Sequence, residues 1–169
     1  MQWREDLIAN TGTSGLKAAA VAWITCPGFV VITWWRLAKW LRSSGRPGRL
    51  ISWLILRCCL MQRGCYISLL AEIGPGLILP HPTGIVVGDG VRLGRSVTLY
   101  QNVTLGRHTA QRPGYPQLED NVTVYAGGVI IGPITIGQGA TVAANSVVNR
   151  EVAPNTVVAG VPARVLRAS

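Results

Sequence analysis

The sequence has few acidic residues, few histidines and no closely paired cysteines. Seven Asp and Glu stand against 16 Lys and Arg among 169 residues, which gives a formal net charge of +9. Charged residues make up only 14% of the chain, and there are 20 glycines, which excludes a disordered chain and a coiled coil. Two histidines and four cysteines without a Cys-x-x-Cys pair exclude most zinc modules. The cysteines lack the spacing of a disulfide scaffold, so we expect a reduced, cytoplasmic protein.

Tryptophan and phenylalanine are absent from the second half of the chain. Residues 1–64 contain all six Trp, the single Phe and nine of the 16 basic residues, but only Glu5 and Asp6 among the acids. Residues 65–169 are instead rich in Val and Gly. The composition therefore predicts a boundary near Gly64, with a basic, Trp-rich α-helical region over 1–64 and a different domain over 65–169.

Two helices are predicted in the first region. One follows Pro27-Gly28 over FVVITWWRLAKWLRS, because proline is well tolerated in a first helical turn. The segment SSGRPG predicts a break, and ISWLILRCCLMQR predicts a second helix after it.

A long apolar run is nearly absent. Residues 18–35 are uncharged and just long enough to span a membrane, but Pro27-Gly28 divides them. Three alternatives remain: a helical cap packed on the second domain or on another subunit, which we favour; peripheral contact of residues 18–63 with the inner face of the cell membrane; and a true span. No nucleic-acid partner is expected, because the tryptophans lie among aliphatic residues.

The second domain shows an apolar residue at every sixth position. Glycines and other small residues fill many positions between, so the period predicts stacked coils with three short flat faces each. The residues in phase are Val87, Leu93, Leu99 and Leu105, then Leu118, Val124, Ile130, Ile136, Val142 and Val148, with Ile67, Ile73 and Leu79 in an earlier phase.

Two places interrupt this period. A two-residue phase shift surrounds His81, and the loop 106–116 separates Leu105 from Leu118. Insertions in solenoid proteins gather on the binding face, so this loop is predicted to form the wall of a site. The alternative is a tolerated surface loop.

The segments IGPGLILPHPTGIVVGDG, VTLYQNVTLG and NSVVNREVAPNTVVAGVPARV resemble the hexapeptide-repeat acyltransferases, and within these the serine acetyltransferase branch. The resemblance covers about residues 65–167. It implies a mainly β fold, a left-handed parallel β-helix, here with an N-terminal α-helical cap. It also implies a homotrimer, or a higher assembly through the N-terminal helices, that binds acetyl-CoA between neighbouring β-helices without a metal. The opening EDLIAN and the following helices resemble small O-acetyltransferases of exopolysaccharide synthesis.

His81 falls on the position of the family's catalytic base. A histidine suits that role, because an alcohol must lose its proton as it attacks a thioester near neutral pH. The alternative is a turn histidine between two prolines.

The resemblance does not extend to the acceptor-binding residues. Tyr66 and Pro80 stand where serine acetyltransferases have aspartates, and Gly114-Tyr115 replaces the Arg-His that holds the serine carboxylate. Without that cationic pair, serine becomes a less suitable acceptor. We therefore expect O-acetylation of a sugar hydroxyl in a polysaccharide or its lipid-linked precursor. The residues predicted to line the acceptor site are Tyr66, Pro80, His108, Arg112 and Tyr115.

Small residues mark the predicted acetyl-CoA site. Gly106, Ala126 and Ala144 match the positions along which the family's pantetheine arm lies. Arg150 and Arg164 could bind the CoA phosphates, the alternative being solvated charges. Two alternative functions remain open, serine O-acetylation in cysteine biosynthesis and a non-catalytic trimeric scaffold. A hexapeptide-repeat carbonic anhydrase is excluded, because its metal needs three histidines.

Overall fold

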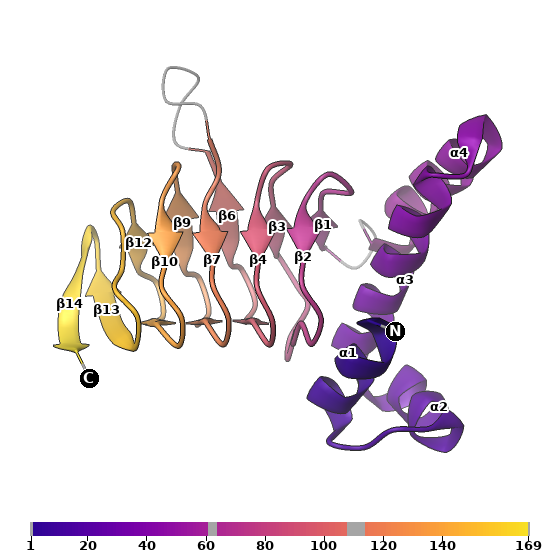
Figure 1. Cartoon of the computed structure of the whole chain (residues 1–169), viewed down its shortest axis with the longest axis horizontal. Helices are drawn as coiled ribbons and strands as arrows, with labels where there is room; N and C mark the ends of the chain where they lie inside the picture. Colours follow the sequence, from indigo (N-terminus) through magenta and orange to yellow (C-terminus); the bar gives the residue numbers. More distant parts are fainter. Residues whose placement is uncertain (1, 61–63, 108–113, 169) are drawn as a thin grey trace.

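The computed structural model describes residues 2–60, 64–107 and 114–168. Helices occupy the N-terminal part and stand at one end of an elongated β domain, while the C-terminus lies at the other end (Figure 1). The helices are α1 (Gln2–Thr11), α2 (Leu16–Thr25), α3 (Pro27–Arg42) and α4 (Gly45–Ile55), followed by a π-helical turn, η1 (Leu56–Leu60). The predicted proline start is confirmed, since α3 begins at Pro27.

The predicted break between the two helices is confirmed at Ser43-Ser44, but it is shorter than expected. α4 already begins at Gly45, inside SSGRPG, and includes Pro47. Pro47 falls in the first turn, where a backbone N–H has no partner within the helix, so its missing donor costs little. Gly48 lets α4 approach α3 closely, because a Cβ there would lie 2.1 Å from the Leu41 carbonyl oxygen.

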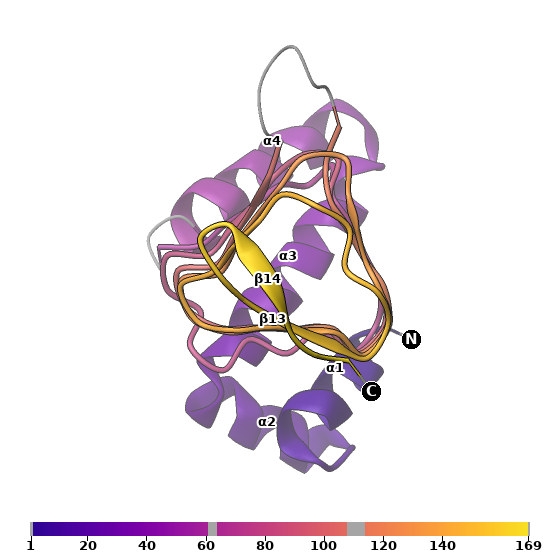
Figure 2. The same ribbon diagram turned by 90° about the vertical axis from the view of Figure 1, so that its left-hand side faces the viewer.

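The β domain is a left-handed parallel β-helix with three sheets, as predicted. Viewed along its axis, the coils superpose into a three-sided outline in front of the helices (Figure 2). Sheet 1 contains β1 (Tyr66–Ile67), β3 (Val86–Val87), β6 (Thr104–Gly106), β9 (Val129–Ile131) and β12 (Val147–Val148). Sheet 2 contains β2 (Glu72–Ile73), β4 (Arg92–Leu93), β7 (Gln117–Leu118) and β10 (Thr135–Ile136). Sheet 3 contains β5 (Thr98–Leu99), β8 (Thr123–Val124), β11 (Thr141–Val142), β13 (Thr156–Gly160) and β14 (Ala163–Ala168).

The strand register explains both interruptions of the period. Val87 pairs with Leu105, 18 positions later, whereas Ile67 pairs with Val87, 20 positions later. The first coil therefore contains the two additional residues predicted around His81. Leu105 pairs with Ile130, 25 positions later, so the loop 106–116 enters the β-helix as an insertion between sheets 1 and 2.

The six-residue pattern forms the core. In each short strand the inward residue is buried and its neighbour faces outward, and the buried positions stack from coil to coil. One face of α3 and α4 continues this core at the first coil, through Val31, Ile32, Trp35, Ala38 and Ile55. The structure thus shows the helices packed on the chain's own β-helix, the alternative that we favoured.

A buried ion pair fixes the helical cap to the first coil. The Asp6 carboxylate, fully buried, accepts hydrogen bonds from Arg36 Nε at 3.0 Å and from the backbone N–H groups of Gly76 and Leu77. Arg36 in turn donates to the carbonyl oxygens of Ile73 and Gly74. This network joins α1, α3 and the turn after β2 with every partner hydrogen-bonded.

Among the described residues, no single helix is long and apolar enough to cross a membrane. α2 and α3 together are long and apolar enough to cross a membrane, but the chain bends by 110° between them.

Candidate active site

His81 lies in the turn that joins sheet 3 to sheet 1 in the first coil. We call this stack of turns the His81 corner: it contains His81 in the first coil, Tyr100 in the second and Tyr125 in the third. The His81 and Tyr100 rings lie 6.4 Å apart between centroids, and Tyr100 stacks on Tyr125 at 4.9 Å. The imidazole, exposed to solvent, stands at the end of a row of aromatic rings.

The backbone of this corner is held in a fixed conformation. The Thr83 N–H bonds the His81 carbonyl oxygen at 2.8 Å, and the Cys65 thiol donates to the Pro82 carbonyl oxygen at 2.7 Å. Gly84, with φ of +68°, faces Asn102 of the next coil, and a Cβ at Gly84 would lie 2.1 Å from Asn102 Oδ1. Asn102 itself has φ of +58°, a conformation that asparagine tolerates better than most residues. The residues that directly follow His81 are thus held in place.

Cys65 supports this corner through its hydrogen bond to Pro82, and its thiol is expected to react slowly. Burial raises the pKa of its thiol to about 11. Because the thiolate is the reactive form, we expect iodoacetamide at pH 8 to modify the exposed Cys58 in the folded protein and to leave Cys65 unmodified. Mass spectrometry of the digested protein would measure this, with urea-unfolded protein as the control in which both react. Equal labelling of the two in the folded state would contradict the described burial.

Most of the predicted site residues that the structure describes lie at two corners of the β-helix. Pro80, Ala126 and Ala144 lie in the His81 corner, in the first, third and fourth coils. Gly106, the last residue of β6, and Tyr115, just before β7, lie where sheet 1 connects to sheet 2, which we call the loop corner, and Arg150 lies there too, in a later coil. Arg164 lies on β14 in the terminal hairpin. His108 and Arg112 lie outside the described residues. Within one chain, the loop corner and the His81 corner are different edges of the β-helix.

Two predicted residues have neighbours that the sequence did not indicate. The Tyr115 ring covers Gly88 and Gly90, where added Cβ atoms would lie 2.5 and 2.4 Å from ring carbons. Tyr66 pairs with Val86 in sheet 1, and its side chain lines a cavity beside the helical cap. Their assignment to the acceptor stays a prediction.

Tyr100 and Tyr125 are the residues that sequence reasoning missed. Both directly follow an inward leucine or valine of sheet 3, namely Leu99 and Val124, which pair with each other. Reading the repeat coil by coil, rather than as a line of apolar residues, would have placed both tyrosines in the turn stack that begins at His81.

Gly106 has open space around it. Among the described residues, no heavy atom would lie within 4 Å of a Cβ at Gly106, in contrast to Gly84. The packing of the described residues therefore does not require a glycine at this position.

Comparison with known proteins places this architecture in a family. No family model matches the chain. The serine acetyltransferase of Mycobacterium tuberculosis is 34% identical over 165 residues, which are 96% of this chain and 71% of that protein. The chain belongs to the serine acetyltransferase family. The serine acetyltransferase of Escherichia coli K12 is 37% identical over 141 residues, 82% of this chain and 50% of that protein. This family member thus spans about half the length of the first curated relatives that it matches.

Solved structures of the family have the same fold. The Neisseria gonorrhoeae serine acetyltransferase in complex with serine superposes with a TM-score of 0.84 at 30% identity, covering 98% of this chain and 67% of that one. A serine acetyltransferase in complex with CoA superposes with a TM-score of 0.80 at 29% identity, covering 97% and 68%. These relatives support the serine acetyltransferase branch of our prediction. They give no support to the finer placement beside exopolysaccharide O-acetyltransferases.

Proposed function

We propose that this chain transfers an acetyl group from acetyl-CoA to a hydroxyl group, with His81 as the general base. The observation that carries this proposal is the position of His81, which is exposed at the end of an aromatic row and held by hydrogen bonds to its own carbonyl oxygen and to that of Pro82. A base held in this way can accept the hydroxyl proton as the oxygen attacks the thioester carbon. The proton then passes from the imidazolium to the departing CoA sulfur, which balances the reaction.

L-serine is the acceptor that the relatives favour, because these relatives are named serine acetyltransferases and one is named in complex with serine. The comparisons support this alternative better than our first expectation of a sugar. A neutral hydroxyl acceptor remains a second candidate on one observation. Tyr100 and Tyr125 present stacked rings beside His81 that suit the apolar face of a sugar, while Tyr66 and Pro80 provide no carboxylate for an ammonium group. Release of thiol from acetyl-CoA with L-serine and with a sugar panel separates the two.

Three small residues fit the pantetheine arm of acetyl-CoA. Gly106 leaves space that no described residue fills, Ala126 is partly exposed and Ala144 is exposed. Because the loop corner and the His81 corner are separate in one chain, a site that uses both needs a neighbouring chain. We include a homotrimer in the proposal for that reason, and light scattering would measure its mass.

A pair of glycine substitutions tests this assignment. Gly106→Ala is expected to leave the unfolding temperature unchanged while raising the KM for acetyl-CoA, because its methyl enters space predicted for the ligand. Gly84→Ala is expected to destabilise the fold by about 1–3 kcal/mol, because alanine is strained at φ of +68° and meets Asn102. Thermal unfolding and initial-rate kinetics of both variants measure these effects. A normal KM in a stable Gly106→Ala protein would contradict the CoA assignment.

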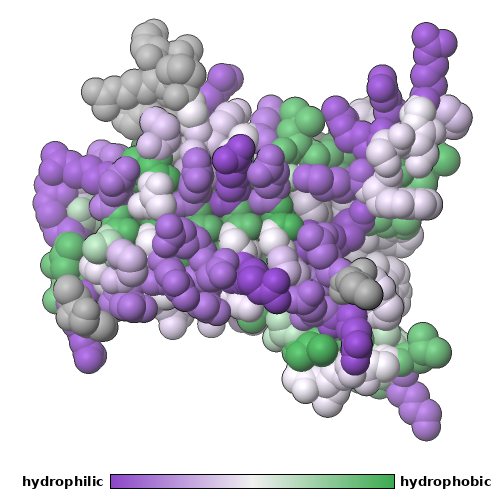
Figure 3. Space-filling view, in the orientation of Figure 1, coloured by the Kyte–Doolittle hydropathy of each residue, from purple (hydrophilic) through white to green (hydrophobic). Residues whose placement is uncertain are grey.

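The helical cap also supports our proposal of peripheral membrane contact. Leu16, Ile24 and Trp40 are exposed on α2 and α3, and hydrophobic residues emerge among hydrophilic ones around α2 (Figure 3). Together with the basic charge of this region, they suit the surface of an anionic membrane.

Sedimentation with lipid vesicles tests this contact. The protein is expected to pellet with anionic vesicles at low salt and to be released as salt screens the charges. Ile24→Ser should weaken the binding, because it removes an exposed apolar contact, and neutral vesicles are the control. A protein that stays in the supernatant with anionic vesicles at low salt would contradict the proposal.

A further inference from the structure

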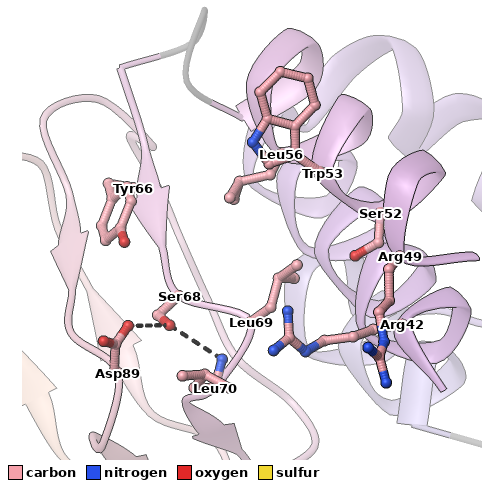
Figure 4. A pocket seen from close by; sticks show the side chains of 10 residues that line it. All are labelled: Arg42, Arg49, Ser52, Trp53, Leu56, Tyr66, Ser68, Leu69, Leu70 and Asp89. Atoms are coloured by element: carbon pink, nitrogen blue, oxygen red, sulfur yellow. Dashed lines mark hydrogen bonds between the residues drawn. The ribbon is translucent and has the colours of Figure 1, made fainter. Parts of the chain in front are cut away.

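A cavity of about 190 Å³ lies between the helical cap and the first two coils of the β-helix. Figure 4 shows its two walls: Arg42, Arg49, Ser52 and Trp53 come from the helices, and Tyr66, Ser68 and Asp89 come from the β-helix. It is separate from the His81 corner, because His81 and its aromatic neighbours are not among its lining residues. Its volume suits a small molecule or the head of a larger one.

The helical wall contains a buried hydroxyl without a partner. Ser52 is 1% exposed, and its Oγ has no hydrogen-bond partner among the described residues. Figure 4 shows this oxygen directed into the space between the helices and Leu69. A buried hydroxyl without a hydrogen bond lowers the stability of a fold, so a ligand oxygen at this point would satisfy it.

Two arginines extend to the same space. The Arg42 side chain reaches from α3 toward Leu69, and Arg49 lines the same cavity from α4 (Figure 4). Within the described part of the chain, neither guanidinium forms an ion pair. Two guanidinium groups at one cavity favour an anion between them, and each offers a planar fork of donors.

The opposite wall supplies acceptors in a fixed geometry. The Ser68 hydroxyl, itself buried, donates to Asp89 Oδ1 at 2.6 Å and accepts from the Leu70 N–H at 3.1 Å. Trp35 Nε1 fixes the same residue by donating to the Ser68 carbonyl oxygen. An ionised carboxylate can accept about four hydrogen bonds, so Asp89 retains acceptors for hydroxyl groups of a ligand.

We propose that this cavity binds a small phosphorylated polyol. The phosphoryl group lies between Arg42 and Arg49 and accepts a hydrogen bond from Ser52, and the polyol hydroxyls face Asp89. Two guanidinium forks and a hydroxyl provide more donors than the two oxygens of a carboxylate can use, whereas a phosphate monoester presents three terminal oxygens. The proposal concerns binding alone and does not depend on acetyl transfer at His81.

Calorimetric titration of the full chain with sn-glycerol 3-phosphate tests the proposal, with glycerol and acetate as controls. Vesicles containing phosphatidylinositol 4-phosphate form a second arm, which distinguishes a lipid headgroup from a soluble phosphate ester. Saturable binding in either arm is expected, and glycerol and acetate should bind far more weakly. Each titration is repeated with saturating CoA, and binding is expected to persist, because the CoA phosphates are assigned elsewhere.

Substitutions locate the binding. Arg42→Gln and Arg49→Gln are each expected to weaken it about tenfold or more, as loss of a charge-assisted hydrogen bond predicts. Arg46→Gln on the same helix is the matched control, because it removes one charge without touching the cavity, and should change binding less than about twofold. Ser52→Ala should weaken binding while keeping or raising the unfolding temperature, since it removes an unpartnered hydroxyl.

Three results would overturn the proposal. The first is no saturable binding in either arm. The second is an equal loss in Arg46→Gln and in the cavity variants, which would indicate non-specific attraction to a basic protein. The third is competition by CoA, which would place the probe at the acetyl-CoA site instead.

Discussion

Replacing His81 by alanine is expected to lower kcat/KM for acetyl transfer by about 10²–10⁴-fold, the usual contribution of a positioned general base. The imidazole is exposed and, within the described residues, contacts a ring only at Tyr100, so its removal leaves the core intact. The affinity for CoA and the unfolding temperature should therefore stay near those of the unchanged protein. Thiol release from acetyl-CoA, measured with L-serine and with a sugar panel, gives the rates.

Two further variants distinguish loss of the general base from loss of the side chain's volume and packing. His81→Gln retains hydrogen-bonding groups but cannot accept a proton at neutral pH, so it should lose as much activity as His81→Ala. Tyr100→Phe retains the ring beside His81 and should retain most of the rate. Full activity in His81→Ala with the acceptor that the unchanged protein uses would remove His81 from the chemistry.

The six-residue period predicted the β-helix because the signal is local and repeated. Each inward position needs an apolar residue and each turn needs a small one. The same pattern therefore recurs in each successive coil of the sequence. The same counting located the longer first coil at His81 and the insertion after Leu105, and the strand pairings agree with both. The start of α4 was misplaced, because Gly and Pro were taken as a break when Gly48 instead permits close contact with Leu41.

The site was only partly predictable, because its parts meet across coils. His81 stood out at a phase shift, but its contact with Tyr100 depends on the register between coils, which a single line of sequence does not display. The division of the other candidates between two corners likewise follows from the strand topology. The cavity lined by Ser52 could not be predicted from the sequence, because it depends on how α4 packs against the turn after β1.

The attachment of the cap gives the second large expected effect. Asp6→Ala should lower the free energy of unfolding by about 3–5 kcal/mol, because it leaves the Arg36 guanidinium, with a side chain 12% exposed, without its charge partner. It also removes the acceptor of the Gly76 and Leu77 N–H groups, some seventy positions away in the sequence. Urea unfolding followed by circular dichroism measures the loss from the midpoint and the slope.

The neighbouring residue provides a matched control for this prediction. Glu5 lies on the same helix and also pairs with an arginine, Arg95, but the side chains of Glu5 and Arg95 are 43% and 60% exposed. Water screens that pair, so Glu5→Ala should cost less than about 1 kcal/mol. Similar losses in the two variants would mean that the charge of α1, rather than the buried network, determines stability. A large loss confined to Asp6→Ala, reproduced by Arg36→Ala and not increased in the double variant, would assign the effect to this one pair, because coupled residues are non-additive.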